Sequence, residues 1–413
     1  IIFAARRQIM MIVFHSIITI FVLLSTAFIS VSMKLVPKVD VVCLPEALYD
    51  CIASPSTNGW SADKVLETGE WSLQPGGATA NVACALAKLG MKSSFAGSIG
   101  DDKDGDGLIS MFEGYGIDTS FCTRTSSYPT RRVLVTRSNS GDRQFSSFWD
   151  KKPSTQFSDC YYNLNIAQII NLIKSVKFAV VMGTLGLAHG STASVIAQIS
   201  SLLKYSNTNI NITSNSWSLG AVTSVTSVTS LKHEKLPLLV IDVNWRDVFW
   251  PNQLSVSSTY EISESNIDTN NAKALILKMI TGADIVKLTD EEVQWVLGID
   301  ATTALKNPEK VYNAIRPKLG VLITAGEKGA ACHFTNIGSL SSLAVPIEPV
   351  DTTGAGDAFT AGFLYAMARP EASFDSKESV EYALKIACIS GALVCTKPGA
   401  IYGQPSLDEV LAV

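Results

Sequence analysis

Six short apolar runs recur along the chain, and helical stretches separate most of them. The runs lie at 39–44, 93–99, 178–183, 237–243, 283–288 and 320–326. Helical patterns lie at 80–89, 191–203, 271–280, 291–297 and 308–315. Apolar strands that alternate with helices pair in parallel, because each helix crosses back over one face of the sheet. The pattern therefore predicts an α/β fold with a mainly parallel sheet flanked by helices.

A different pattern occupies residues 121–148, where polar and apolar side chains alternate. Residues 131–137 read RRVLVTR, a polar turn follows at 138–143, and QFSSF continues at 144–148. Alternation is typical of a strand with one face toward water, and two such strands joined by a tight turn form an antiparallel hairpin. The segment predicts a small antiparallel β appendage on the α/β core.

The composition narrows the class of protein. A hydrophobic fraction of 47% and a charged fraction of 17% exclude a disordered or collagen-like chain. The net charge of −4 gives no overall positive field, so we expect no nucleic-acid partner. The eight cysteines show no Cys-x-x-Cys pair and the four histidines are scattered. This argues against a zinc site or a disulfide scaffold and fits a reducing compartment.

The first 36 residues differ from the rest of the chain. After Arg6 and Arg7, residues 9–31 form an uncharged apolar run of 23 residues, which is long enough to span a bilayer once. Small residues at 25–27 also suit a cleavage zone behind a signal-like segment. A removed targeting segment, a retained anchor, and a start at Met10, Met11 or Met33 stay open. We assign 1–36 to a targeting or signal-like hydrophobic segment and 37–413 to the folded domain.

The end of that segment bears on the compartment. The stretch STAFISVSMK at 25–34 resembles the cleavage region of bipartite plastid presequences in algae with secondary plastids. A plastid destination would reconcile an apolar leader with the reducing compartment that the cysteines favour. We therefore favour the plastid, with the cytoplasm as the alternative.

Two polar stretches interrupt the strand and helix pattern. Residues 206–230 and 255–271 are rich in Ser, Thr and Asn. Such segments have little apolar surface to bury. We expect both to be surface loops inserted into the α/β domain.

The first of two glycine motifs is GGATANVACALAKLG at 76–90. Gly76 and Gly77 precede a helix, so the backbone there can approach a ligand closely. Asn81 lies in the first turn of that helix. Taken alone, the motif is equally compatible with a tight strand-to-helix turn in which Asn81 is a local cap.

The second motif is DTTGAGDAFTAGFL at 351–364. Its Gly-Ala-Gly turn leads into a helix that begins at about Asp357, so N–H groups and the helix dipole converge where an anion would be stabilised. A carboxylate there could remove a proton from a hydroxyl beside a phosphate, or it could simply be an acid favoured by the helix dipole. No Lys-Ser or Lys-Thr follows the glycines, so this is not a Walker loop.

The two motifs resemble the paired signatures of the ribokinase-like (PfkB) carbohydrate kinases, and the similarity runs from about 39 to 404. The segment GSIGDDKDG at 97–105 is similar to the glycine-rich turn of that family. DVNWRDVFWP at 242–251 resembles the D-x-N-x-R-x-x-x-W segment of fructokinases. KLTDEEVQWVLG at 287–298 and TAGEKG at 324–329 resemble the magnesium-linked and nucleotide-binding segments.

The resemblance implies catalytic and sugar-binding roles residue by residue. It makes Asp357 the general base and gives the anion hole to Gly354, Ala355 and Gly356. It gives the hydrogen bonds to sugar hydroxyls to Asp50, Gly76, Gly77 and Asn81. Asp50 follows an apolar strand, at the place where the family has an Asp that ends its first strand. Elements at about 51–75 and 121–148 would form a lid over the sugar, through which two copies of the chain would form a homodimer.

The resemblance also implies nucleotide and cation sites. ATP would contact Thr324, Gly326 and Gly329, and Glu292 would organise Mg²⁺ through water. A monovalent cation such as K⁺ would bind at Asp351 and Thr353.

Several residues depart from the family pattern or stay open. Pro45 stands where the family usually has glycine, and Thr289 stands where it has asparagine. Arg131 or Arg132 would meet either an anionic substrate or solvent. Asp242, Asn244 and Arg246 would orient phosphate or only cap a strand.

The resemblance implies an ATP-dependent sugar kinase with a small-molecule sugar as its substrate, and a fructokinase above all. In that reaction the γ-phosphoryl group of ATP passes to D-fructose and gives fructose 6-phosphate. A ribokinase or nucleoside kinase on the same fold, and a non-catalytic fructokinase-like regulatory subunit, are the alternatives.

Overall fold

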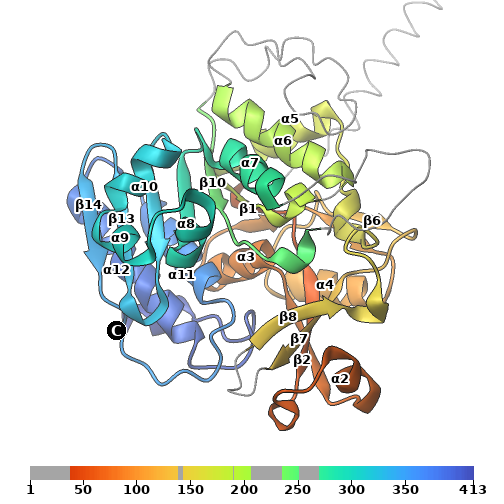
Figure 1. Ribbon diagram of the computed structural model, residues 1–413. Coiled ribbons are helices and arrows are strands. Elements are labelled where there is room, and N and C mark those ends of the chain that lie inside the picture. Colours follow the sequence, from red (N-terminus) through yellow and green to blue (C-terminus); the bar gives the residue numbers. More distant parts are fainter. Residues whose placement is uncertain (1–37, 138–142, 189, 206–234, 251–268) are drawn as a thin grey trace, which may run out of the picture. The chain divides into compact units, whose positions relative to one another are not determined.

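The computed structural model describes residues 38–137, 143–188, 190–205, 235–250 and 269–413. Val39–Val413 forms one compact unit (Figure 1). The expected leader at 1–36 lies outside the described residues. So does the polar stretch at 206–230, and so does 255–271 except for the start of a helix at Thr269.

An eight-stranded sheet forms the centre of this unit. Its order is β14(Gly338–Ser342), β13(Ala330–Phe334), β12(Gly320–Thr324), β11(Ile285–Thr289), β10(Leu238–Asp242), β9(Val176–Gly183), β1(Val39–Leu44) and β4(Ser93–Phe95). The pairs from β4 to β12 are parallel, and β13 and β14 are antiparallel additions at one edge. The predicted mainly parallel sheet is confirmed.

Helices cover both faces of this sheet (Figure 1). One face packs on α3(Ala78–Lys88), α4(Lys103–Gly114), α11(Ala355–Met367) and α12(Lys377–Val394), which share one apolar cluster with it. Other helices contact strands of the large sheet, but none of their described residues belongs to that cluster. They are α5(Ile166–Ser175), α6(Gly190–Tyr205), α8(Asp290–Leu297), α9(Ala301–Lys306) and α10(Pro308–Ile315). The remaining helices are α7(Thr269–Ile280), which contacts α8, and α13(Leu407–Leu411), which contacts α12. Burial on both faces explains why the strands read as continuous apolar runs.

A second, four-stranded sheet corresponds to the expected lid, and we call it the lid sheet. Its order is β3(Trp71–Gly76), β2(Leu48–Ala53), β7(Arg132–Arg137) and β8(Arg143–Phe148). The outer pairs are antiparallel, as the alternating sequence predicts, but the central pair β2–β7 is parallel. A third, two-stranded sheet pairs β5(Ser98–Gly100) with β6(Thr123–Thr125), so the start of 121–148 lies outside the lid sheet.

One face of the lid sheet packs on a short helix of its own. Side chains alternate along β2 and β7, so Cys51, Ala53 and Leu134 lie on the face away from the cavity described below. Helix α2(Ala62–Thr68) places the fully buried Val65 against them, with Trp60, Trp71 and Trp149 packed around this small core. The lid sheet therefore has a hydrophobic core separate from that of the large sheet.

One local prediction differs from the structure, and the structure shows the surroundings of the two lid arginines, which the sequence left open. The expected strand at 93–99 is divided into β4 and β5, because Gly97 approaches the backbone so closely that a Cβ there would lie 2.5 Å from the Pro45 carbonyl. The buried Arg131 does not reach solvent, whereas the Arg132 side chain is 27% exposed. Arg131 is buried in an ion pair with Asp159, and Arg132 pairs with Asp104.

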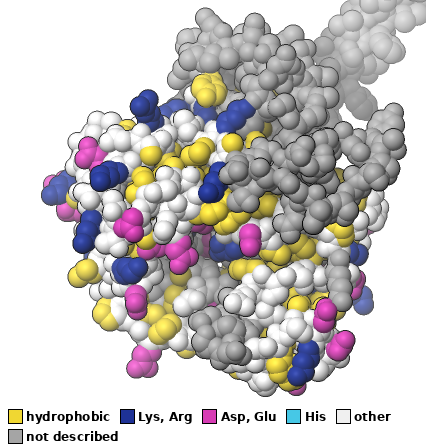
Figure 2. Space-filling model, in the orientation of Figure 1, with side chains coloured by type: hydrophobic (Ala, Val, Ile, Leu, Met, Phe, Trp, Pro, Cys, Tyr) yellow, Lys and Arg dark blue, Asp and Glu magenta, His cyan; other side chains and the backbone are white. Residues whose placement is uncertain are grey.

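Side chains of both charge signs are interspersed over the face of the molecule that Figure 2 shows. Within the residues that the structure describes, no helix combines the length and the apolar character needed to cross a membrane.

Candidate active site

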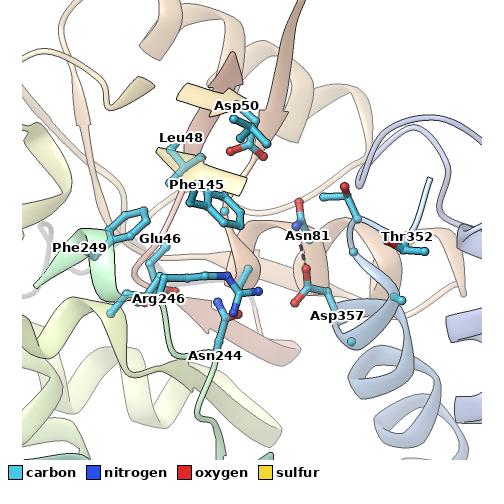
Figure 3. Close-up of a pocket in the computed structure, with 18 of the residues that line it drawn as sticks. Glu46, Leu48, Asp50, Asn81, Phe145, Asn244, Arg246, Phe249, Thr352 and Asp357 are labelled. Carbon is cyan, nitrogen blue, oxygen red and sulfur yellow. Dashed lines mark hydrogen bonds between the residues drawn. The ribbon is translucent and has the colours of Figure 1, made fainter. Parts of the chain in front are cut away.

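A cavity of about 290 Å³ lies between the lid sheet and the carboxyl ends of the parallel strands. Ligands of α/β proteins bind at this end of the sheet, because loops and helix N-termini converge there. The lid sheet contributes Leu48, Asp50 and Phe145, and Asn81 and Asp357 lie on helices across from them (Figure 3).

The first turn of α11 lines one wall of the cavity. Gly354 precedes the helix in a left-handed conformation, with φ of 82°, and a Cβ there would lie 3.0 Å from Ala400. The helix begins at Ala355, two residues before the predicted start at Asp357. Amide N–H groups of a first helical turn have no partner within the helix, so this turn favours an anion.

Asp357 lies in that turn with its carboxylate at the cavity. Burial raises the pKa of Asp357 to about 6, and the nearby carboxylate of Asp242 adds to the rise. A hydrogen bond from the Asn81 amide (Nδ2 to Oδ2, 2.7 Å) and the positive charges of Lys287 and Arg246 act in the opposite direction. A carboxylate with a pKa near 6 is ionised at neutral pH and still basic enough to accept a proton.

Asn81 reaches the cavity from the first turn of α3. Gly77 precedes this helix with φ of 100°, and a Cβ there would lie 2.6 Å from the Glu46 carbonyl. The Asn81 amide nitrogen bonds Asp357, while its buried Oδ1 has no partner among the described residues. The side chain can thus orient Asp357 and still accept a hydrogen bond from a ligand.

Asp50 lies on the lid sheet, on the face toward the cavity. Asp50 follows the apolar strand β1, as expected, but it lies six residues after β1 ends and within the next strand, β2. A Cβ on Gly76 would lie 2.6 Å from Asp50 Oδ2, so only glycine lets the neighbouring strand β3 pass this carboxylate.

Lys287 and Asp242 form a buried ion pair beside the first turn of α11. The Lys287 Nζ lies 3.1 Å from Asp242 Oδ1, and the two side chains are about 5% exposed. The same Nζ lies 2.8 Å from where a Cβ on Gly356 would be. Burial alone would lower the pKa of Lys287, but Asp242, Glu292 and Asp357 together raise it. The cation therefore stays charged next to the glycine turn.

Glu292 is held by backbone amides at the start of α8. Thr289 and Glu292 form a capping box, in which each side chain accepts a hydrogen bond from the other residue's N–H. The second oxygen of Glu292 accepts a hydrogen bond from the Trp245 N–H at 2.7 Å. Thr289 thus has a capping role, and the Glu292 carboxylate has a fixed orientation at the cavity wall.

The nucleotide segment predicted at 324–329 forms a tight turn after β12. The Ala325 N–H bonds the Gly329 carbonyl, and a Cβ on Gly329 would lie 2.2 Å from the Ser342 carbonyl. Thr324 pairs with Thr289 across neighbouring strands, so this turn lies at the same edge of the sheet as the cavity.

Asp351, one of the two residues expected at the monovalent cation site, links two segments that are distant in the chain. Its carboxylate accepts hydrogen bonds from the Thr353 N–H at 3.0 Å and the Gly399 N–H at 2.8 Å. The buried side chain therefore fixes the loop before α11 against the residues that follow α12.

Comparison with known families accounts for most of the chain. Residues 38–231 and 245–407 match the description "pfkB family carbohydrate kinase". The chain belongs to the pfkB family of carbohydrate kinases. It is thus a phosphotransferase with an alcohol group as acceptor, and the resemblance stated from the two glycine motifs is confirmed.

The pfkB relatives match over nearly their full length. Fructokinase-1 of Oryza sativa subsp. japonica is 29% identical over 373 residues, which cover 90% of this chain and 96% of the relative. "Probable fructokinase-6, chloroplastic" of Arabidopsis thaliana is 25% identical over 374 residues, which cover 90% of this chain and 81% of the relative.

Two solved structures share the ribokinase-like fold. The fructokinase of Xylella fastidiosa with bound ATP has a TM-score of 0.65 at 23% identity, covering 91% of this chain and 98% of that one. A double mutant of the Vibrio cholerae O395 fructokinase, bound to fructose, ADP and potassium ion, has a TM-score of 0.64 at 21% identity, with the same coverage.

The cavity of this pfkB kinase brings together many of the predicted site residues. They are Asp50, Gly77, Asn81, Glu292, Thr353, Gly354, Ala355, Gly356 and Asp357. Five others lie beyond its lining: Gly76, Thr324, Gly326, Gly329 and Asp351. Of the three residues left open, Asn244 and Arg246 line the cavity, and Asp242 pairs with Lys287.

Sequence reasoning missed two charged residues of the site, Lys287 and Glu46. The signal for Lys287 is a charge inside an otherwise apolar strand, IVKLT. Glu46 lies two residues after the end of the apolar β1 and is only 2% exposed. A charged residue next to a buried strand is an unusual position that points to a special role.

The residues present fit a magnesium ion that is held mainly by phosphates. Within the described parts of the chain, no group of three or more His, Cys, Asp and Glu could hold a metal ion. Both oxygens of Glu292 already accept backbone N–H groups. Mg²⁺ commonly keeps several waters and binds substrate phosphates with only one or two carboxylates.

Proposed function

We propose that this chain transfers the γ-phosphoryl group of ATP to D-fructose and forms fructose 6-phosphate. The observation that carries the proposal is Asp357, a carboxylate with a raised pKa in the glycine-rich first turn of α11. The names of the plant relatives and of the two solved fructokinases support fructose as the acceptor.

Asp357 is the general base of the proposed reaction. Its carboxylate takes the proton of the primary hydroxyl as that oxygen forms a bond to the γ-phosphorus. The bond between the γ-phosphorus and its bridging oxygen breaks at the same time, and ADP leaves with the electron pair. The hydrogen bond from Asn81 fixes the orientation of the carboxylate for this proton transfer.

Two kinds of group stabilise the negative charge on the phosphoryl group during transfer. Amides of Gly354, Ala355 and Gly356 form the anion hole, and Lys287 adds a full positive charge beside Gly356. Preorganised donors in a site of low polarity stabilise a transition state strongly, because they need not reorganise during the reaction.

The nucleotide and its cations occupy the other end of the site. Thr324, Gly326 and Gly329 contact ATP, and Glu292 orients water on Mg²⁺. When bound, Mg²⁺ neutralises charge on the β- and γ-phosphates. Asp351 and Thr353 bind K⁺, a proposal supported by the potassium ion in the Vibrio cholerae structure and by the Asp351 bond to Gly399.

The sugar lies between the lid sheet and α3. Asp50, Gly76, Gly77 and Asn81 bond its hydroxyl groups, and the lid excludes water that would otherwise compete for the phosphoryl group. Asn244 and Arg246 lie at the same cavity, in the segment that resembles fructokinases, and this supports the choice of fructose.

The homodimer through the lid stays a proposal from the family resemblance. One face of the lid sheet carries α2 and the other faces the cavity, so two copies would pair through the edge strands β3 or β8. Size-exclusion chromatography with light scattering measures the mass of the protein in solution. A dimer would support this assembly, and a monomer at every protein concentration would contradict it.

Delivery to a plastid is likewise a proposal. It is supported by the apolar run at 9–31 and by the chloroplastic relative of Arabidopsis thaliana. N-terminal sequencing of the native protein from isolated plastids tests it. We expect a mature chain that begins between about 28 and 36, and recovery in the cytoplasm would contradict it.

ATP consumption by the purified chain against fructose, other sugars and nucleosides tests the activity. We expect fructose to give the highest kcat/KM and a product phosphorylated on a primary hydroxyl. In the matched control Asp357→Asn, kcat should fall by roughly 10²–10⁴-fold with ATP affinity unchanged. A higher kcat/KM for ribose or a nucleoside than for fructose would contradict fructose as the acceptor. ATP binding without turnover of any acceptor would indicate a non-catalytic regulatory subunit.

A further inference from the structure

Glu46 is a buried acid that joins three elements around the cavity (Figure 3). It lies between β1 and β2, and its side chain is 2% exposed. One oxygen accepts a hydrogen bond from the Gly186 N–H at 3.3 Å, and the other lies 3.1 Å from Thr79 Oγ1. A Cβ on Gly183 would lie 2.6 Å from the carboxyl group, so the end of β9 packs directly on it.

The hydroxyl of Thr79 has three oxygen or nitrogen neighbours, all from Glu46. Oγ1 accepts a hydrogen bond from the Glu46 N–H at 2.9 Å. It also lies 3.1 Å from the Glu46 carbonyl and 3.1 Å from the carboxyl Oε2. A hydroxyl has one proton to donate and two lone pairs to accept with.

All three contacts can be separate two-centre hydrogen bonds only if Oε2 carries a proton, whereas with an ionised carboxylate the two acceptor oxygens would compete for or share the single Thr79 proton. If the Thr79 hydroxyl donates to the Glu46 carbonyl, it must accept from both the N–H and Oε2, and Oε2 must carry a proton. The Glu46 carbonyl also accepts a hydrogen bond from the Ala80 N–H at 3.2 Å, so it keeps a donor whichever oxygen receives the Thr79 proton. The neutral acid is favoured because the Glu46 side chain is only 2% exposed, and because the Arg131 cation that shares a small cavity with it is already paired with Asp159.

We propose that Glu46 is a positioning residue that is protonated at neutral pH and donates this proton to Thr79, which fixes the first turn of α3. That turn presents Gly77 and Asn81 to the cavity, and the Gly186 contact fixes the neighbouring wall at Leu185. The effect on the acceptor sugar rests on the function proposed above.

The charges around Glu46 agree with a neutral group. Burial raises the pKa of Glu46 to about 8, against the hydrogen bonds from Thr79 and Gly186, and Asp159 adds to the rise. Arg131, Asp159 and Cys160 share with Glu46 a small cavity of about 10 Å³. The Arg131 charge would favour ionisation, but Asp159 compensates it through two hydrogen bonds of 2.7 and 2.8 Å. On the other side the main cavity is lined by Asp50, Arg246, Lys287, Glu292 and Asp357.

A direct test is the infrared spectrum of the full chain, which needs no enzymatic activity. The carbonyl stretch of a protonated carboxylic acid is distinct from carboxylate bands. We expect a difference spectrum between wild type and Glu46→Gln at pH 7 to show the loss of one protonated acid, and at pH 9.5 the loss of a carboxylate. Loss of a carboxylate at pH 7 would overturn the proposal.

Thermal stability gives a second readout without substrate. In the unfolded chain Glu46 ionises near its ordinary pKa of 4.5, whereas the folded protein keeps the proton until about pH 8. The folded state thus binds more protons in this range, so the stabilising contribution of Glu46 falls as pH rises from 4.5 to 8. The melting temperature of wild type relative to Glu46→Gln should fall over this range, and a constant difference would contradict it.

Kinetics connect the proton to the acceptor site. Glu46→Gln keeps a donor for Thr79 and an acceptor for Gly186 at every pH. Between pH 7 and 9.5 the acceptor KM of wild type should rise by about 2- to 10-fold, the effect of one lost hydrogen bond, and that of Glu46→Gln should stay constant. The Thr79→Val variant should have a raised acceptor KM already at pH 7. Thr79→Ser, which keeps the hydroxyl, is the matched control and should behave like the wild type. Equal pH profiles for wild type and Glu46→Gln would show that this proton does not position the acceptor site.

Discussion

Asp357 and Asn81 are hydrogen-bonded to each other at the cavity, although they lie 276 positions apart in the chain. The amide donates to the carboxylate and thereby stabilises its ionised form, while burial and Asp242 destabilise that form. The balance leaves Asp357 with a pKa of about 6. A general base must be deprotonated to act, so this value sets the lower pH limit of the proposed activity.

The pH profile of kcat/KM tests this balance. We expect the activity of the wild type to fall as the pH falls through about 6, because Asp357 becomes protonated. Asn81→Leu removes the hydrogen bond that lowers the pKa of Asp357, so the loss should begin at higher pH. If the pH at which activity is lost stays the same in Asn81→Leu while the sugar KM rises, Asn81 binds the sugar and does not affect the pKa of Asp357.

Lys287 is the second charged group beside the anion hole. Its removal would leave Asp242 buried without its partner, which costs about 3–5 kcal/mol of stability. We therefore compare Asp242→Asn with the double variant Asp242→Asn/Lys287→Met, in which no unpaired carboxylate remains. The double variant should have a kcat roughly 10²–10³-fold lower than the single variant, with the sugar KM little changed. Equal turnover in the two would restrict Lys287 to a structural role.

At the scale of elements, the helices and strands that depend on residues close together in the sequence were predicted best. Helix α10 spans the expected 308–315, because Pro308 suits a helix start. The strand expected at 93–99 was wrong, since the close approach of Gly97 to Pro45 cannot be read from nearby residues. For the same reason no local pattern could reveal the bond between Asn81 and Asp357, or the parallel pairing of β2 with β7.

The lid sheet should depend on its own small core. Leu134→Ala leaves a cavity under α2, and such truncations cost about 2–5 kcal/mol. Because Val135 and Asp50 lie on the opposite face of the same strands, we expect the sugar KM to rise while ATP affinity stays unchanged. Amides of β2 and β7 should also exchange hydrogen faster.

Ile169→Ala is the matched control for the lid variant. Ile169 is fully buried in α5, away from the lid core. It should lower the melting temperature without changing the sugar KM. A similar rise of the sugar KM in both variants would mean that general stability, and not the lid core, sets sugar affinity.

At the scale of the whole molecule, strand β1 connects the two sheets that enclose the cavity. It lies inside the large sheet, between β9 and β4, and the chain passes from it through Glu46 into β2 of the lid sheet. The two halves of the lid sheet then come from separate segments, β2 with β3 and β7 with β8. The lid sheet therefore forms only when these two separate segments come together.

Two deletions with nearby end points test where the folded unit begins. The family match begins at residue 38 and β1 at Val39, so removal of 1–37 should leave the melting temperature unchanged and kcat/KM within about twofold. Removal of 1–44 also deletes β1, whose Val41, Val42, Cys43 and Leu44 are at most 1% exposed. Burial of each such side chain contributes roughly 1.5–3 kcal/mol, and a domain is stable by only about 5–15 kcal/mol. The longer deletion should therefore abolish cooperative unfolding and activity, and a folded, active product would show that β1 is dispensable.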